Sequence, residues 1–178
     1  MEIVTYIIEG ALEHHDDMGN TGVIRPGEIQ RMSAGTGVRH SEYNHSKKEP
    51  VHLVQLWITP AVQHLEPSWE QKSFSLAGRS GKLLPIAVPA GSKSNGSVHI
   101  HQDVSIYTSL LAPGRSTAHQ IAEGRRAYVF VIGGNLKLNR ETLGSGDQAR
   151  VSKERKLQLS ATSGPGATPA DFLLFDLP

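Results

Sequence analysis

The chain has 178 residues, and its 18 Lys and Arg side chains nearly balance 17 Asp and Glu side chains. Balanced charge provides no general attraction to nucleic acid or to an anionic membrane, so neither is expected as a direct partner. The absence of cysteine excludes disulfides, thiolate metal ligands and a thiol nucleophile. No apolar run approaches membrane-spanning length, and no basic segment followed by an apolar one opens the sequence. A cytoplasmic protein is therefore expected.

Runs of β-branched and aromatic residues, separated by short turns, predict an all-β chain. In the first half, the predicted strands are residues 2–9, 11–15, 23–24, 29–33, 38–42 and 51–59. Residues 61–74, which contain Pro67, are expected to form an irregular crossover. In the second half, the predicted strands are residues 83–88, 104–111, 127–132, 136–138, 149–151, 157–159 and 172–176. No long helical period is present, so the rhythm favours β-barrels.

A short internal repeat predicts two barrels of similar build. The segment from Tyr6 to Gly10 aligns with the segment from Phe130 to Gly134, and residues 25–28 align with residues 144–147. We expect one barrel over residues 1–90 and a second over residues 91–178, with the seam in the Gly- and Ser-containing loop 90–96.

The chemistry of the chain centres on His40 and Glu42, which follow a glycine-rich turn at residues 35–37. On an extended strand, residues two apart face the same way, so the imidazole and the carboxylate should point together. Two His and one carboxylate suit non-haem Fe(II) and its oxygen chemistry. The pair by itself also fits a solvated polar face, and it needs partners from elsewhere. On the strand 51–59, alternation places Gln55 and Trp57 on one face and His52 on the other.

The remaining histidines give weaker signals. His14 and His15 are expected at an exposed hairpin tip. His52 faces Leu56 and favours a core position, whereas His45 and His64 lie in polar loops. His99 and His101 form a His-x-His pair where the second half begins, with metal ligation as the less favoured interpretation.

Several segments closely resemble the pirin family of bicupins, and in particular its bacterial branch with quercetin 2,3-dioxygenase activity. These segments are residues 2–10, 13–20, 32–44 and 98–103, Trp57, and residues 172–178. The resemblance implies an all-β fold of two cupin-type barrels (jelly rolls). It further implies Fe(II), or another divalent first-row metal, in the N-terminal barrel, and dioxygen chemistry on a flavonol-like substrate. His40 and Glu42 match family metal ligands, and Glu42 is a candidate general base; a homodimer is left open.

The chain departs from the family pattern at its start. Family members carry a His-x-His segment a few residues before the position of Glu2, and those two His complete the metal site. Here the chain begins after that segment. An incomplete N-terminal barrel is therefore expected, with weakly held metal and impaired activity.

The second barrel should hold no metal, because Ile121 and Ala149 stand at ligand places and Arg125 stands near the carboxylate place. Its expected role is packing and support of a dimer. A non-enzymatic binding module, or a transcriptional co-regulator of the pirin type, is the alternative to an oxygenase.

Overall fold

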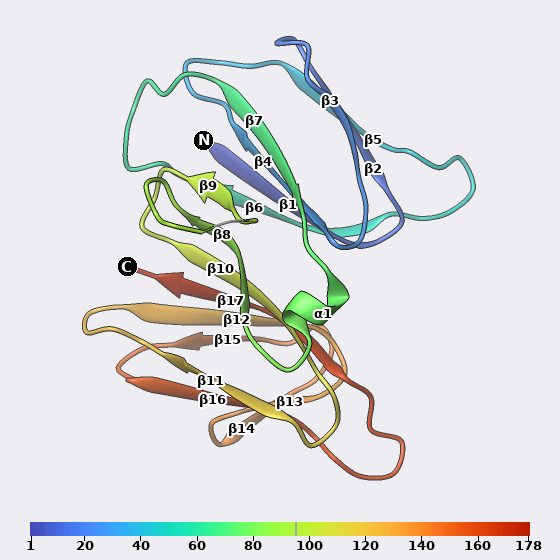
Figure 1. Cartoon of the computed structure of the whole chain (residues 1–178), viewed down its shortest axis with the longest axis vertical. Coiled ribbons are helices and arrows are strands. Elements are labelled where there is room, and N and C mark those ends of the chain that lie inside the picture. Colours follow the sequence, from blue (N-terminus) through green and yellow to red (C-terminus); the bar gives the residue numbers. More distant parts are fainter. Residues whose placement is uncertain (95) are drawn as a thin grey trace. The chain divides into compact units, whose positions relative to one another are not determined.

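The computed structural model describes residues 1–94 and 96–178. It confirms the predicted all-β bicupin-type architecture, with several antiparallel sheets and, within those residues, a single short helix, α1 (Leu76–Arg79). None of the described helical structure is long and apolar enough to cross a membrane. The chain divides into two compact units, shown in Figure 1. Unit 1 comprises Met1–Phe74 and Val88–Asp103, and unit 2 comprises Ser75–Ala87 and Val104–Pro178.

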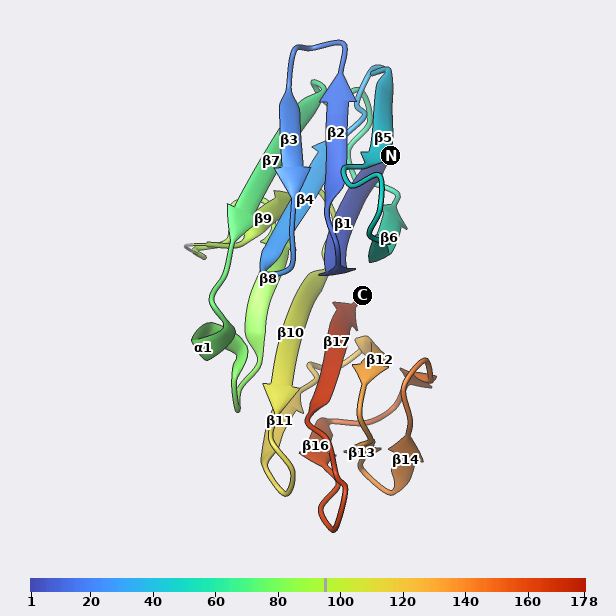
Figure 2. The same ribbon diagram turned by 90° about the vertical axis from the view of Figure 1, so that its right-hand side faces the viewer.

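Unit 1 contains two sheets and the short strand β9, all labelled in Figures 1 and 2. One sheet has the order β6-β1-β4-β7 and the other the order β3-β2-β5. The strands are β1 (Glu2–Glu9), β2 (Leu12–Asp16), β3 (Thr21–Ile24), β4 (Glu28–Ser33), β5 (His40–Asn44), β6 (His52–Ile58), β7 (Ser68–Ser73) and β9 (Val98–Ile100). Buried Ile7, Leu12 and Ile24 form an apolar cluster with Val51 and Leu53 packed against it.

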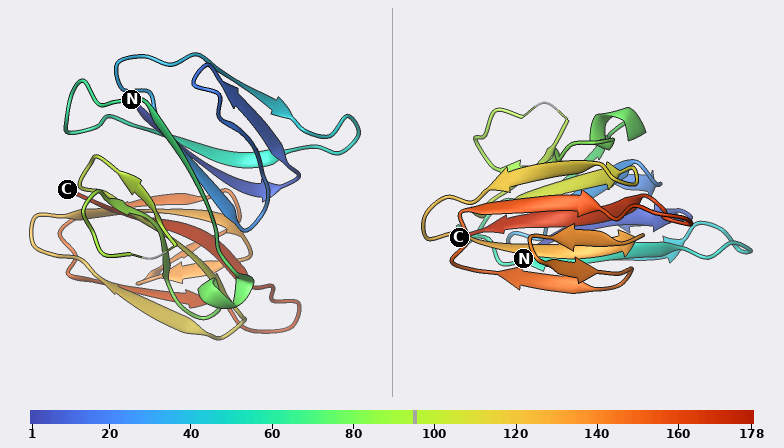
Figure 3. Two further views of the ribbon diagram at one scale, coloured as in Figure 1. Left: turned by 45° about the horizontal axis from the view of Figure 1, so that its top comes forward. Right: turned by 90° about the horizontal axis from the view of Figure 1, so that it is seen from below.

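Unit 2 also contains two sheets, seen from a further direction in Figure 3. Among the strands of this unit, the first sheet runs β15-β12-β17-β10-β8, and the second runs β11-β16-β13-β14. The strands are β8 (Leu84–Pro89), β10 (Ser105–Leu111), β11 (Ser116–Gln120), β12 (Arg126–Gly133), β13 (Leu136–Leu138), β14 (Glu141–Leu143), β15 (Gln148–Val151), β16 (Lys156–Ala161) and β17 (Ala170–Leu177). Their inward side chains form one large apolar core that includes Phe172, Leu174 and Leu159, all fully buried.

The internal repeat is visible in the backbone of each unit. Gly10 follows β1 with φ +76°, and Gly134 follows β12 with φ +72°. A Cβ at either glycine would lie 2.2 Å from a proline carbonyl oxygen, of Pro50 and Pro169 respectively, so both positions require glycine. The turn before β4 and the turn before β15 are closed alike, because the carboxylates of Glu28 and Asp147 each accept the backbone N–H three residues earlier. The two units therefore share one folding plan.

The division of the chain differs from the single break after residue 90 that the sequence suggested. Residues 75–87 belong to unit 2 because β8 pairs with β10 and because Arg79 forms a bidentate ion pair with Asp171. Residues 88–103 belong to unit 1 because β9 contacts β4 and β7. The expected seam at residues 90–96 includes Asn95, which lies outside the described residues.

The expected irregular crossover is also partly wrong. Residues 68–73 form β7, which pairs with all six residues of β4. Because Arg31 on β4 forms a 3.1 Å ion pair with Glu70 on β7, polar side chains stabilise this pairing. Strands β9, β11 and β14 and helix α1 were not expected either.

Candidate functional site

The candidate site lies in unit 1, where β5 carries His40 and Glu42 on the same side of the strand. Strand β2 runs antiparallel to β5 and places Asp16 opposite His40 and His14 opposite Glu42. Residues that face each other across an antiparallel pair point to the same side of the sheet. The register thus gathers two imidazoles and two carboxylates on one face.

The burial of His14 corrects the expectation that it sits at an exposed hairpin tip. Its side chain is fully buried, and its ring stacks on His40 at 5.7 Å and on Trp69 at 6.0 Å between ring centroids. Gly22 lies opposite His14 on β3, and a Cβ there would fall 2.7 Å from the Trp69 ring, so glycine makes room for the stack. His15 does face outward as expected, and it is exposed. The strand alternation that buries Leu12 also buries His14, which is the signal the sequence offered.

Glu42 is held by neighbours on three strands. Its Oε2 accepts a 2.7 Å hydrogen bond from Gln55 Nε2 on β6, and its Oε1 accepts a 3.4 Å bond from Gln30 Nε2 on β4. The Nδ1 of His14 lies 3.9 Å from Oε1. The Glu42 side chain is 18% exposed, so it reaches solvent from a largely enclosed position.

Gln55 connects Glu42 to an exposed aromatic residue. Its Nε2 also donates to Thr5 Oγ1 at 3.3 Å, and its Oε1 accepts a 3.0 Å hydrogen bond from Trp57 Nε1. The Trp57 side chain stands largely in solvent, with the residue 67% exposed. The sequence placed Gln55 and Trp57 on one face of their strand, but it did not connect them to Glu42.

The electrostatics of the cluster favour an ionised Glu42 and a protonated His14. Burial raises the pKa of Glu42, but the nearby His14 imidazole, the hydrogen bond from Gln55 and the charge of His40 outweigh it and hold the pKa below its usual range. Burial lowers the pKa of His14, yet the carboxylates of Glu42 and Asp16 raise it overall. Glu42 is therefore a persistent anion beside two imidazoles.

These residues are of the types that bind a metal, but too few of them converge on one point. Imidazole and carboxylate are the donors that first-row divalent metals take, and Glu42 is already ionised. Within the described chain, however, no three His, Asp or Glu side chains converge so as to hold a metal ion. His14 and His40 stack at an interplanar angle of 21° rather than aiming at one point. His14 Nδ1, Gln30 Oε1 and Trp69 Nε1 are buried without a hydrogen-bond partner among the described groups, so the interior around the cluster is polar and lacks some hydrogen bonds.

The other histidines of unit 1 do not join this cluster. His52 is exposed at the start of edge strand β6, so the expected core position is wrong. His99 and His101 do not share one ligand point, because His101 binds the buried Glu2 while the His99 backbone N–H binds Glu70. His15 and His45 each approach a different oxygen of half-buried Glu13, at 2.6 and 2.7 Å. Sequence reasoning gave Glu2 no structural role, although it is fully buried and accepts three hydrogen bonds from Ser33 and His101.

Unit 2 carries apolar residues at the positions that correspond to His14, His40, Glu42, Gln30 and Gln55. The aligned glycines and strand registers match His14, Glu42 and Gln55 with Leu138, Leu159 and Leu174. They also match His40 with Leu157 and Gln30 with Ala149. Ala149, which the sequence suggested as a ligand place, therefore corresponds to Gln30, and the position of His40 is taken by the fully buried Leu157. Leucine offers no lone pair to a cation, so a metal-free second barrel stays our prediction.

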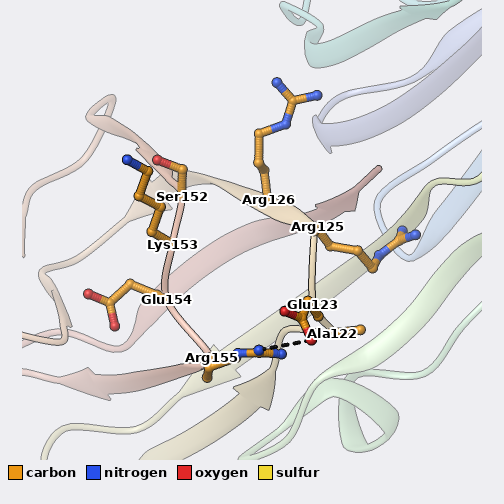
Figure 4. Close-up of a pocket in the computed structure, with 9 residues that line it drawn as sticks. Ala122, Glu123, Arg125, Arg126, Ser152, Lys153, Glu154 and Arg155 are labelled. Atoms are coloured by element: carbon orange, nitrogen blue, oxygen red, sulfur yellow. Dashed lines mark ion pairs between the residues drawn. The ribbon is translucent and has the colours of Figure 1, made fainter.

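His119 and Arg125 of unit 2 serve one carboxylate. His119 Nε2 lies 2.7 Å from Asp176 Oδ2, and Arg125 Nε donates to Asp176 Oδ1 at 2.5 Å. A cavity of about 290 Å³ lies nearby, lined by residues 122–126 and 152–155 (Figure 4). Its Arg155 pairs with Glu123 on the surface, and its Arg126 binds the Pro178 carbonyl oxygen. These cations are committed to protein partners, so the cavity does not define a ligand.

The two β units, with a polar histidine and carboxylate cluster inside one of them, define a bicupin. Family models agree: the model "Pirin" matches residues 1–58, and the model "Quercetinase C-terminal cupin domain" matches residues 87–177. The chain belongs to the pirin family.

Individual relatives extend over the whole chain. It is 40% identical over 178 residues to a quercetin 2,3-dioxygenase of Escherichia coli (strain K12), covering all of this chain and 73% of that protein. The crystal structure of YhhW from Escherichia coli matches with a TM-score of 0.90 and 38% identity, covering 99% of this chain and 71% of that one. The bacterial pirin YhhW in complex with nickel(II) matches with a TM-score of 0.88 and 38% identity over 100% and 72% of the two chains.

Proposed function

We propose that unit 1 contributes to a metal-dependent dioxygenase site that opens the ring of a flavonol such as quercetin. The observation that carries this proposal is the contrast between the units. Unit 1 holds His14, Glu42 and Gln55 where unit 2 holds three buried leucines. Burying polar groups without full hydrogen bonding costs free energy, so their presence in an otherwise shared plan indicates function. The naming of the 40% identical relative supports the flavonol and dioxygen, and the nickel(II) complex of YhhW supports a divalent metal.

In this proposal His40 and Glu42 are metal ligands. A bound Fe(II), or another first-row divalent metal, would act as a Lewis acid and as a template for flavonol and dioxygen. Gln55 fixes Oε2 of Glu42 by its 2.7 Å hydrogen bond and leaves Oε1, with its longer 3.4 Å bond, more available. The lowered pKa of Glu42 makes its carboxylate a weak proton acceptor, which favours the ligand role over the general-base role.

Two ligands leave most of the coordination shell to water. Loss of a single supporting contact typically lowers metal affinity about 10–100-fold, so two missing imidazole ligands should lower it further. We therefore infer that the 178-residue chain alone binds the metal weakly and turns over quercetin slowly. An upstream His-x-His segment of the family pattern, or a His from a second subunit, would complete the shell.

The test compares the 178-residue chain with a version extended upstream by a His-x-His segment. Metal content is measured by elemental analysis, and ring opening by loss of quercetin absorbance under dioxygen. We expect metal and activity to rise together in the extended chain and to fall in its His40→Ala variant. His15→Ala, which removes an exposed imidazole on the outer face of β2, is the matched control.

Two results would contradict the proposal in different ways. Stoichiometric metal in the 178-residue chain, with activity that survives His40→Ala, would place the site elsewhere. A metal-loaded extended chain that leaves quercetin intact would instead support the non-enzymatic binding module.

A further inference from the structure

Three side chains form a continuous hydrogen-bonded chain from solvent to Glu42. Trp57 Nε1 donates to Gln55 Oε1 at 3.0 Å, and Gln55 Nε2 donates to Glu42 Oε2 at 2.7 Å. Trp57 is 67% exposed, whereas the Glu42 side chain is only 18% exposed. The outer end of this chain is therefore open to solvent, and its inner end lies at the proposed metal ligand.

The chemistry of the groups fixes the direction of every bond. An indole N–H only donates, and an ionised carboxylate only accepts. The oxygen of Gln55 must therefore face Trp57, so its NH₂ group faces Glu42 and Thr5. Without the indole N–H, the Gln55 amide loses the partner that holds its oxygen outward. A rotated amide would set an oxygen against the Glu42 carboxylate, which repels it.

We propose that Trp57 is a positioning residue for the Glu42 carboxylate and acts through Gln55. This inference rests on the proposed function of Glu42 as a metal ligand. The groups that support a ligand typically tune its metal affinity, because they orient it before the metal arrives. The corresponding positions of unit 2 carry Leu174 and Leu159, so the shared folding plan does not need the polar link between Gln55 and Glu42.

Trp57→Phe removes the indole N–H and keeps an aromatic ring, and the smaller size of that ring matters little because Trp57 is largely exposed. Nickel(II) alone is titrated into the 178-residue chain, and site-specific paramagnetic broadening of backbone NMR signals separates binding at β5 from binding at exposed His15 and His45. Tyr43→Phe is the matched control, since Tyr43 is an exposed aromatic on β5 that faces away from Glu42.

The expected affinities form a series. Gln55→Leu should weaken nickel(II) binding at β5 about 10–100-fold. Trp57→Phe should weaken it roughly fivefold, the effect of one ordinary hydrogen bond on an equilibrium. The double variant should bind no more weakly than Gln55→Leu, because Trp57 has nothing to act on once Gln55 is gone. Gln55→Glu keeps the acceptor for Trp57 but removes the donor to Glu42, so it should be at least as weak as Gln55→Leu.

A metal-free readout tests the link directly. The chain has two tryptophans, so loss of a signal in Trp57→Phe assigns the Trp57 indole N–H resonance. Glu42→Ala frees the Gln55 amide and should shift that resonance, whereas Tyr43→Phe should leave it unchanged. An unchanged indole resonance in Glu42→Ala would overturn the inference.

The titration adds a second decision. Equal nickel(II) affinity in Trp57→Phe and Tyr43→Phe would also overturn the inference, provided that His40→Ala still abolishes binding at β5. If His40→Ala leaves binding unchanged, the proposed metal site fails, and the indole resonance alone decides whether Trp57 positions Glu42.

Discussion

Replacing the polar cluster of unit 1 by the leucines of unit 2 should remove the candidate site while leaving the free energy of unfolding almost unchanged. The change is the triple variant His14→Leu, Glu42→Leu and Gln55→Leu, which copies Leu138, Leu159 and Leu174. Those leucines are 0–4% exposed in unit 2, so the shared architecture accepts them at these positions.

The single variants and the triple variant should change the free energy of unfolding by different amounts, or in opposite directions. Glu42→Leu removes the acceptor of the 2.7 Å bond from Gln55 and leaves the donors of Gln55 and Gln30 facing an apolar group. A hydrogen bond to a charged group contributes about 1.5–3 kcal/mol, so this single change should lower the free energy of unfolding by that amount. Gln55→Leu should cost a similar amount, because it leaves Glu42 without its shortest donor. The triple variant also removes the Gln55 donor and the His14 imidazole, and only Gln30 loses a partner through its long 3.4 Å bond, so it should lie within about 1 kcal/mol of the parent chain or be more stable.

Urea unfolding followed by tryptophan fluorescence measures the stability of unit 1 specifically. Both tryptophans, Trp57 and Trp69, belong to unit 1, so the signal reports that unit. A stability loss in the triple variant equal to the sum of the single losses would refute the reasoning, because groups that share one network must be non-additive. Far-UV circular dichroism of the same samples follows both units and serves as the reference.

Three further predictions test other parts of the structure. The pKa values of Glu70 and Asp16 lie below their ordinary values of 4.5 and 3.8, so the stability that these carboxylates contribute is present above those values and is lost as the pH falls through the lower folded values. The urea concentration at which unit 1 is half unfolded should therefore decrease below about pH 4.5, and it should decrease less in Glu70→Gln. Gly10→Ala and Gly134→Ala should each cost about 2–5 kcal/mol, because a Cβ would meet a proline carbonyl oxygen in a left-handed backbone, whereas Gly19→Ala, with open space around it, should cost about 1 kcal/mol in the same urea titration. His119→Ala should leave the metal content of the extended, metal-loaded chain unchanged, as read by elemental analysis, because His119 is bound to Asp176 and the neighbouring ligand positions are apolar.

Strand alternation and turn residues predicted most of the fold because each strand buries its own pattern of side chains. The pattern did not extend to β7, whose residues are mostly polar and follow Pro67. This strand forms because β4 offers a complete edge and because Arg31 pairs with Glu70 across it. Such a strand depends on its tertiary partner, and local sequence carries little of that information.

Of the candidate site, the sequence predicted only the residues that lie on one strand, β5. Alternation placed His40 and Glu42 together, but their neighbours come from strands that lie 12–28 residues away in the chain. Pairing between distant strands sets that register, and no local signal states it. Two hints were available: the buried alternation from Leu12 to His14, and a glutamine among the apolar residues of β6.

The two units together separate what the fold requires from what the candidate site requires. Gly10 and Gly134, and the matched turns closed by Glu28 and Asp147, are the same backbone devices in both units. These features are found where the chain turns sharply or approaches another segment closely, and they do not depend on whether the interior is polar or apolar. The interior residues differ instead, with leucine in unit 2 and His14, Glu42 and Gln55 in unit 1. Because unit 2 folds around leucine on the same plan, the fold does not explain the buried charge of unit 1, whereas the proposed role of Glu42 as a metal ligand would explain it.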